Sequence, residues 1–147
     1  MFSLRNVRTA TAIVLVSSGL LVGGLSVGAG ATLKAPHLVV TPSVNLTNKQ
    51  IVKVSGTGFK AKDHVYITEC QVTAKGQAGC DINLATPVTI TAKGVLPLTK
   101  FKVITGVIGN GRCGTTAANL KKCAIGVGNI SGGDTASAHI TFLAPKK

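Results

Sequence analysis

Four cysteines, spaced as two equal pairs, are the residues of this chain with the most specific chemistry: Cys70 with Cys80, and Cys113 with Cys123. An even cysteine count in a short exported chain is typical of a disulfide framework. A four-thiol zinc site is the alternative, but zinc ligands usually come as two C-x(2–4)-C pairs, which this spacing does not match. We therefore predict two local disulfides. Each would close its own loop, and loops are where small β domains carry binding residues.

Residues suited to acid–base chemistry are few. His37, His64 and His139 are far apart in the sequence and are expected at strand edges or on the surface. Glu69 and Asp81 flank the first cysteine pair and could approach each other as an acid–base pair. The preferred interpretation is a turn contact for Asp81 and a Glu69 that is solvated or paired with a lysine. The sequence holds no phosphate-binding loop, nucleophile elbow or metal-ligand spacing, so no enzyme activity is predicted.

The N-terminal segment has the features of an export signal. Arg5 and Arg8 precede an almost continuous apolar run at 10–25, and a small-residue cleavage site of the A-x-A kind ends at Ala31. We predict a signal peptide over 1–31 and secretion of the rest. The alternative is an uncleaved membrane anchor, although the apolar stretch barely reaches the roughly 20 residues that a spanning helix needs.

The segment that follows, 32–147, is predicted to be one strongly basic domain. The chain carries 16 Lys and Arg against 4 Asp and Glu, a net charge of +12; Arg5 and Arg8 lie in the signal, which leaves +10. This charge would attract nucleic acid or an anionic cell envelope non-specifically at low salt. Sequence-specific DNA recognition is not expected, because the lysines are scattered, aromatic residues are few and Arg112 is the one arginine after the signal.

Short β-rich segments between glycine- and proline-rich turns predict an all-β, seven-stranded sandwich of the immunoglobulin type. We expect strands at 37–41, 51–54, 64–70, 88–91, 96–104, 123–127 and 136–143. The glycine-rich stretch 106–114 predicts a hairpin bend, and 115–122 could form one turn of helix. Alternation in the third of these strands places Val65, Ile67 and Glu69 on one side.

Several of these segments together resemble the neocarzinostatin family. The resemblance extends from about 38 to 142 and is carried by 40–43, 52–59, 66–70 with the step to Cys80 and Asp81, 123–129 and 138–142. It implies a seven-stranded immunoglobulin-like sandwich with a small hairpin arm and a cleft between them. It also implies a secreted carrier that holds an enediyne chromophore non-covalently, the chromophore being the agent that damages DNA and gives antibacterial action.

The resemblance also suggests where a ligand would lie. The expected lining is Val72, Leu84, Ile108, Ala124 and Gly128, with Glu69 at its edge. Positions that are aromatic in the family are aliphatic here, namely Val72, Leu84 and either Val107 or Ile108. Aromatic contacts worth about 0.5–1.5 kcal/mol each are therefore not expected at these places.

We therefore predict a monomeric, non-catalytic carrier of a small apolar ligand, with no cofactor other than a non-covalent chromophore. The alternative is a cell-envelope or adhesion module that kept the fold and lost the chromophore pocket.

Overall fold

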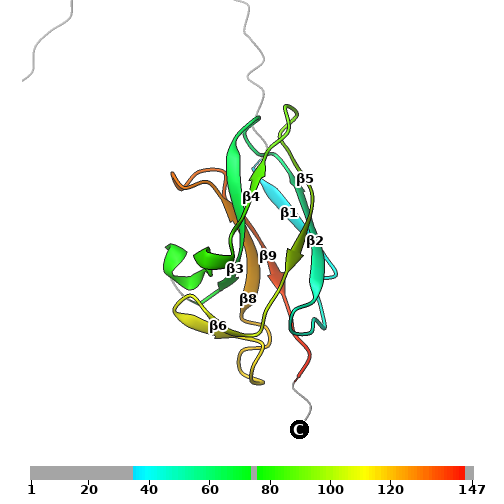
Figure 1. Ribbon diagram of the computed structural model, residues 1–147, viewed down its shortest axis with the longest axis vertical. Coiled ribbons are helices and arrows are strands. Elements are labelled where there is room, and N and C mark those ends of the chain that lie inside the picture. The colour runs from blue at the N-terminus through cyan, green and yellow to red at the C-terminus, as the bar shows by residue number, and fades with distance from the viewer. Residues whose placement is uncertain (1–34, 74–75, 145–147) are drawn as a thin grey trace, which may run out of the picture. The chain divides into compact units, whose positions relative to one another are not determined.

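The computed structural model describes residues 35–73 and 76–144, and the predicted signal peptide lies outside these ranges. The described part of the chain contains nine β-strands (Figure 1): β1 (His37–Thr41), β2 (Ile51–Thr57), β3 (His64–Gln71), β4 (Thr86–Thr89), β5 (Val95–Lys102), β6 (Gly106–Ile108), β7 (Gly111–Cys113), β8 (Cys123–Gly128) and β9 (Ala136–Ile140). None of its helices is long and apolar enough to cross a bilayer.

Seven of the strands form a sandwich of two antiparallel sheets. One sheet has the strand order β1-β2-β5, and the other has the order β4-β3-β8-β9. The remaining strands, β6 and β7, pair only with each other as a hairpin arm, near the lower end of the domain in Figure 1. The predicted seven-stranded sandwich with a small arm is confirmed.

The core between the two sheets follows from period-two alternation along the strands. In β3 the side chains of Val65 and Ile67 are fully buried, while Tyr66 between them is exposed. In β2 the buried positions include Val52 and Val54. Each such side chain contributes about 1.5–3 kcal/mol when removed from water. The register of both sheets is therefore determined by the apolar pattern, because a slip of one residue would expose the whole set.

Two local features differ from the expectations. Residues 115–122 form turns and no helix, because the Asn119 Oδ1 atom accepts hydrogen bonds from the backbone N–H groups of Thr115 and Thr116 at 2.8 and 2.9 Å. Such a side-chain acceptor competes with the helical backbone pattern. Two short 3-10 helices, η1 (Gly76–Gly79) and η2 (Ile82–Leu84), lie in and just after the first cysteine loop, where only irregular loop was expected.

Both predicted disulfides are present. Cys70 is bonded to Cys80 and Cys113 to Cys123, which excludes the zinc alternative because all four sulfurs are used. Each bridge spans a sequence separation of 10 residues. In the chain-entropy model, closing such a loop stabilises the fold by roughly 2.8 kcal/mol. The second bridge also joins the hairpin arm, through β7, to β8 of the sandwich.

The arm contacts the first cysteine loop through a glycine, which leads to a prediction. Gly109 has φ +51°, and a Cβ atom there would lie 2.4 Å from the Ala78 carbonyl oxygen. We expect Gly109→Ala to lower the free energy of unfolding by roughly 2–3 kcal/mol, since left-handed strain and a backbone clash add. Gly76→Ala is the matched control, because Gly76 has φ +63° with no atom within 4 Å of such a Cβ. Equal losses in urea unfolding of the two variants would contradict the contact.

Candidate ligand-binding site

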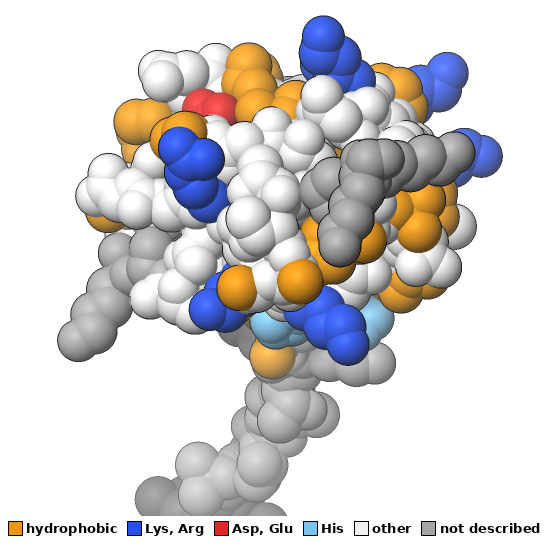
Figure 2. Space-filling model, turned by 90° about the horizontal axis from the view of Figure 1, so that it is seen from below, with side chains coloured by type: hydrophobic (Ala, Val, Ile, Leu, Met, Phe, Trp, Pro, Cys, Tyr) orange, Lys and Arg blue, Asp and Glu red, His pale blue; other side chains and the backbone are white. Residues whose placement is uncertain are grey.

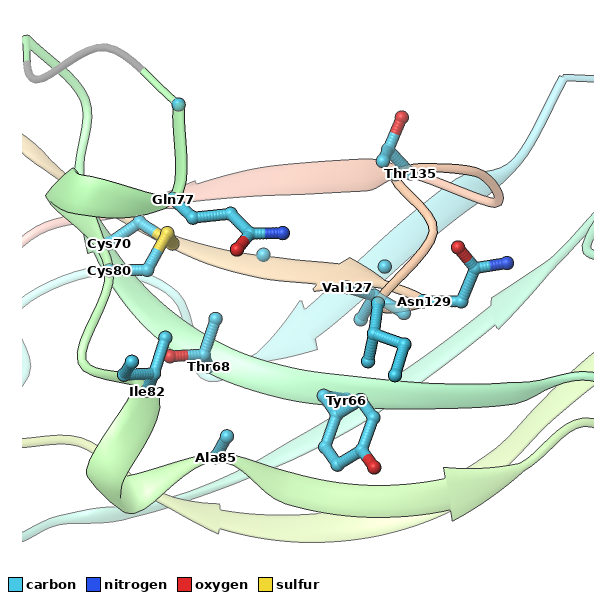
Figure 3. A pocket seen from close by; sticks show the side chains of 15 residues that line it. Tyr66, Thr68, Cys70, Gln77, Cys80, Ile82, Ala85, Val127, Asn129 and Thr135 are labelled. Carbon is cyan, nitrogen blue, oxygen red and sulfur yellow. A yellow bond between two sulfur atoms is a disulfide. The ribbon is translucent and has the colours of Figure 1, made fainter.

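A pocket of about 520 Å³ lies on the outer surface of the four-stranded sheet. Strands β3 and β8 form its floor, and its walls come from the first cysteine loop with η2 and from the loop between β8 and β9. In Figure 3 the Cys70–Cys80 disulfide lies at one end of the pocket and Asn129 at the other. The volume falls within the roughly 300–1,000 Å³ typical of small-molecule sites.

The floor is hollow because glycines on β8 lie opposite side chains on β3. Tyr66 pairs with Gly128, and Thr68 pairs with Gly126. A Cβ atom added at Gly126 would lie 3.2 Å from the Cys70 Sγ atom, and one at Gly128 would lie 3.3 Å from the Thr135 methyl carbon. Any larger side chain at either position would therefore extend into the space that a ligand would use.

The lining is uncharged. Among the described residues that line the pocket there is no Asp, Glu, Lys, Arg or His. Aliphatic surface comes from Ile82, Ala85 and Ile130, and the side chain of Tyr66, which is 39% exposed, adds one aromatic ring. Apolar lining with a few polar groups is the usual character of a small-molecule site. An apolar, uncharged ligand suits these walls.

The first wall is held by hydrogen bonds next to the Cys70–Cys80 disulfide. The backbone N–H of Asp81 donates to the Glu69 carbonyl at 2.8 Å, and the Thr68 hydroxyl donates to the Asp81 carbonyl at 2.8 Å. The Asp81 carboxylate accepts from the Asn83 N–H at 3.2 Å and so caps η2. These bonds place Ile82 beside β3, and they confirm the turn contact expected of Asp81.

The second wall, the loop between β8 and β9, is anchored by Asn129. Its Nδ2 atom donates to the Asp63 carboxylate at 2.7 Å, and its Oδ1 atom accepts from the Gly133 N–H at 2.8 Å. The hydrogen bond from Asn129 lowers the pKa of Asp63. Asp134 of the same loop accepts from the backbone N–H of Lys60 at 2.8 Å. The loop is thus tied to the turn before β3 on two sides.

Glu69 lies on the opposite side of β3 from the pocket and points into the core, with 2% of its surface exposed. Its Oε2 atom accepts from the Ile104 N–H at 2.8 Å, and within the described residues its Oε1 atom has no hydrogen-bond partner. Burial raises the pKa of Glu69 to about 7, the Ile104 hydrogen bond opposes this rise and the charge of Asp81 adds to it. The expectation that Glu69 is solvated or paired with a lysine is therefore wrong.

Comparison with known proteins identifies the family. The family model described as the neocarzinostatin family matches residues 38–142, which is more than half of the chain. The chain belongs to the neocarzinostatin family. Macromomycin from Streptomyces macromomyceticus is 34% identical over 113 residues, covering 74% of this chain and 77% of that protein.

Solved structures of two proteins align with this chain. The macromomycin structure aligns with a TM-score of 0.59 and 32% identity, covering 74% of this chain and all of that one. The solution conformation of apokedarcidin aligns with a TM-score of 0.52 at 23% identity, covering 75% of this chain and 100% of that one, and supports the fold alone.

Of the residues expected to line the neocarzinostatin-type cleft, one lines the pocket. Gly128 lies in the floor, whereas Val72 and Leu84 are exposed, at 39% and 46%, and lie outside the lining. Ala124 shares the outer side of β8 with Gly128 but is 3% exposed. Ile108 is fully buried in the core.

The neighbour of Ile108 in the arm, Val107, is 62% exposed. Val107 lines a second hollow of about 380 Å³ between the arm and the first cysteine loop, together with Gly109 and Asn110. This hollow adjoins Ile82, which also contributes to the main pocket. The arm thus borders the main pocket without contributing to its lining.

Most of the pocket lining was not singled out in the sequence analysis, including Gly126 of the floor and Tyr66. The alternation that places Val65 and Ile67 in the core also places Tyr66 on the outer side of β3, toward Gly128. That signal was available from the sequence. The histidines His37, His64 and His139 are all exposed, lie on three different strands and take no part in the lining.

Proposed function

We propose that this protein is a secreted, non-catalytic carrier that holds a small, uncharged, apolar ligand in the pocket over β3 and β8. The observation that carries the proposal is the glycine floor, because Gly126 and Gly128 leave about 520 Å³ free between two anchored walls. Membership of the neocarzinostatin family favours an enediyne-type chromophore as the ligand class. Damage to DNA and antibacterial action would then belong to the ligand, and the protein would protect and deliver it.

The retained pocket favours this carrier over an envelope module that has lost its ligand site. Residues with charged side chains are absent from the described lining, so a charged ligand would find no counter-charge there. A flat conjugated ligand could lie over Gly126 and Gly128 and contact the Tyr66 ring. Aromatic contact of this kind contributes about 0.5–1.5 kcal/mol beyond burial of area.

The direct test is native mass spectrometry of the protein secreted by its own host, with a denatured sample as control. A mass excess that disappears on denaturation, with absorbance typical of a conjugated group, is the expected result. A bare polypeptide that also fails to take up apolar small molecules would overturn the carrier role.

Tyr66 gives a second, independent test with a neutral apolar fluorophore, N-phenyl-1-naphthylamine, as the probe. We expect Tyr66→Leu to weaken probe binding by about 2- to 10-fold, because the ring contact is lost while apolar bulk remains. Tyr66→Phe is the matched control and should bind within about 2-fold of the parent, since it keeps the ring. If both variants lose affinity equally in a fluorescence titration, the hydroxyl and not the ring makes the contact.

A further inference from the structure

Three lysines project from the outer surface of the three-stranded sheet. Lys53 lies on β2 between the buried Val52 and Val54, and Lys100 and Lys102 lie on β5 on either side of the buried Phe101. Since neighbours along a strand point to opposite sides, all three lysines face away from the core. They are all exposed.

Strand register brings these lysines together. Lys53 lies directly opposite Lys100, and Lys102 lies one exposed position further along β5, opposite Ile51. Directly opposed residues have Cβ atoms about 4.5–5.5 Å apart, and like charges there destabilise a sheet. The described strands of this sheet, β1, β2 and β5, contain no acidic residue that could offset the repulsion.

Protection of sheet edges does not account for the whole cluster. Lysines on an edge strand prevent unwanted strand pairing, which would explain Lys100 and Lys102 on β5. Lys53 lies on β2, which is the central strand of the sheet and already has a partner on each side. A repulsive pair on a central strand is consistent with selection for an anion outside the molecule.

Exposed aliphatic side chains share this surface with the lysines. Val39 on β1 is 45% exposed and Ile51 on β2 is 51% exposed, and both alternate with buried residues. We call Lys53, Lys100, Lys102, Val39 and Ile51 the basic sheet face. On the face of the domain that Figure 2 shows, several basic side chains project and acidic atoms are scarce.

We propose that the basic sheet face binds the surface of an anionic lipid membrane. Lysines near such a surface attract anionic headgroups. Exposed aliphatic side chains lower the free energy further when they leave water and enter the boundary between headgroups and acyl chains. Nucleic acid suits the face less well, because the outward positions of β1, β2 and β5 carry no arginine and, apart from the imidazole of His37, no aromatic side chain for stacking. Anionic lipid is the partner that uses both the charge and the aliphatic groups.

This surface is separate from the pocket. The pocket lies on the outer side of the β4-β3-β8-β9 sheet, and the basic sheet face lies on the outer side of the other sheet of the sandwich. A membrane-bound molecule would therefore keep its pocket free. The inference does not depend on the carrier role, and either can fail alone.

The test is co-sedimentation of the protein, as recovered from its expression host, with phosphatidylglycerol–phosphatidylcholine vesicles at 0.1 M salt. The variant carries Lys53→Gln, Lys100→Gln and Lys102→Gln together. We expect its partition coefficient to fall on the order of 100-fold, from the attraction of three lysines to an anionic surface. Binding by the parent should also fall steeply at 0.5 M salt, because screening shortens the range of the attraction.

A control variant with the same change of net charge separates the effect of the basic sheet face from that of net charge alone. Lys60→Gln, Lys93→Gln and Lys121→Gln remove three exposed charges from loops outside the sheet and should lower binding by less than about 10-fold. Ile51→Ser should weaken vesicle binding yet leave any binding to double-stranded DNA unchanged. Equal losses in the two triple variants, binding to pure phosphatidylcholine that matches the mixture, or binding to DNA but not to vesicles would each overturn the proposal.

Discussion

We expect the stability of Glu69→Gln, measured relative to the parent protein, to be higher at pH 8 than at pH 4. The carboxyl is 2% exposed, and burial raises its pKa to about 7 from an ordinary value of 4.5. A carboxyl whose pKa is raised by folding binds its proton more tightly in the native state. In the parent protein, the stability that this tighter proton binding contributes is therefore complete below about pH 4.5. It is lost as the pH rises through about 7 and the Glu69 carboxyl ionises.

The size of the effect follows from the shift in the pKa. The stability difference between Glu69→Gln and the parent should change by roughly 3 kcal/mol between pH 4 and pH 8. Comparing the two pH values removes effects that do not depend on pH, such as the geometry of the amide near Ile104. Urea unfolding of both proteins across this range measures the change.

Neighbouring groups explain why the carboxylate is unfavourable when ionised. The Ile104 N–H offers one hydrogen bond, at 2.8 Å, while the Oε1 atom lacks a partner among the described residues. The remaining neighbours include the sulfur atoms of Cys113 and Cys123, within 4.8 Å of a carboxylate oxygen, which are bonded to each other. A stability difference that stays constant from pH 4 to pH 8 would show that Glu69 has a counter-charge or reaches water in solution.

Filling the floor of the pocket is expected to remove most of its capacity for ligand. Gly126→Val places methyl groups beside Thr68 and the Cys70 sulfur, where a Cβ atom alone would lie 3.2 Å from that sulfur. Overpacking of this kind costs about 1–3 kcal/mol, and here the ligand would be displaced. We expect affinity for N-phenyl-1-naphthylamine to fall on the order of 10- to 100-fold.

The controls separate the pocket from the rest of the surface. Ser55→Val puts the same side chain on a half-buried position of β2, in the other sheet, and should leave probe affinity unchanged. Gly128→Val, whose Cβ atom would lie 3.3 Å from the Thr135 methyl carbon, should reproduce the loss. If Gly126→Val binds the probe as the parent does, the ligand lies elsewhere, with the hollow beside Val107 the next candidate.

Local pattern was sufficient to predict much of this fold from the sequence. Apolar alternation is a property of neighbouring residues, so β1 (His37–Thr41) was predicted at its observed bounds and the other six sandwich strands overlap their predicted ranges. Equal cysteine spacing led to both disulfides, because a separation of 10 residues leaves each pair to close its own loop. The same period of two placed Glu69 on one side of β3 with Val65 and Ile67, although its burial was not predicted.

Only tertiary packing determined which residues contact each side of these strands. The sequence predicts that Glu69 shares a side with Val65, but only packing shows that Ile104 and the second disulfide surround it and exclude water. Ile108 could not be separated from Val107 in the sequence, since the turn of the arm determines which of the two is buried. The pocket itself depends on the pairing of Tyr66 with Gly128 and Thr68 with Gly126 across two strands. Such pairings join residues about 60 positions apart, and local chemistry does not determine them.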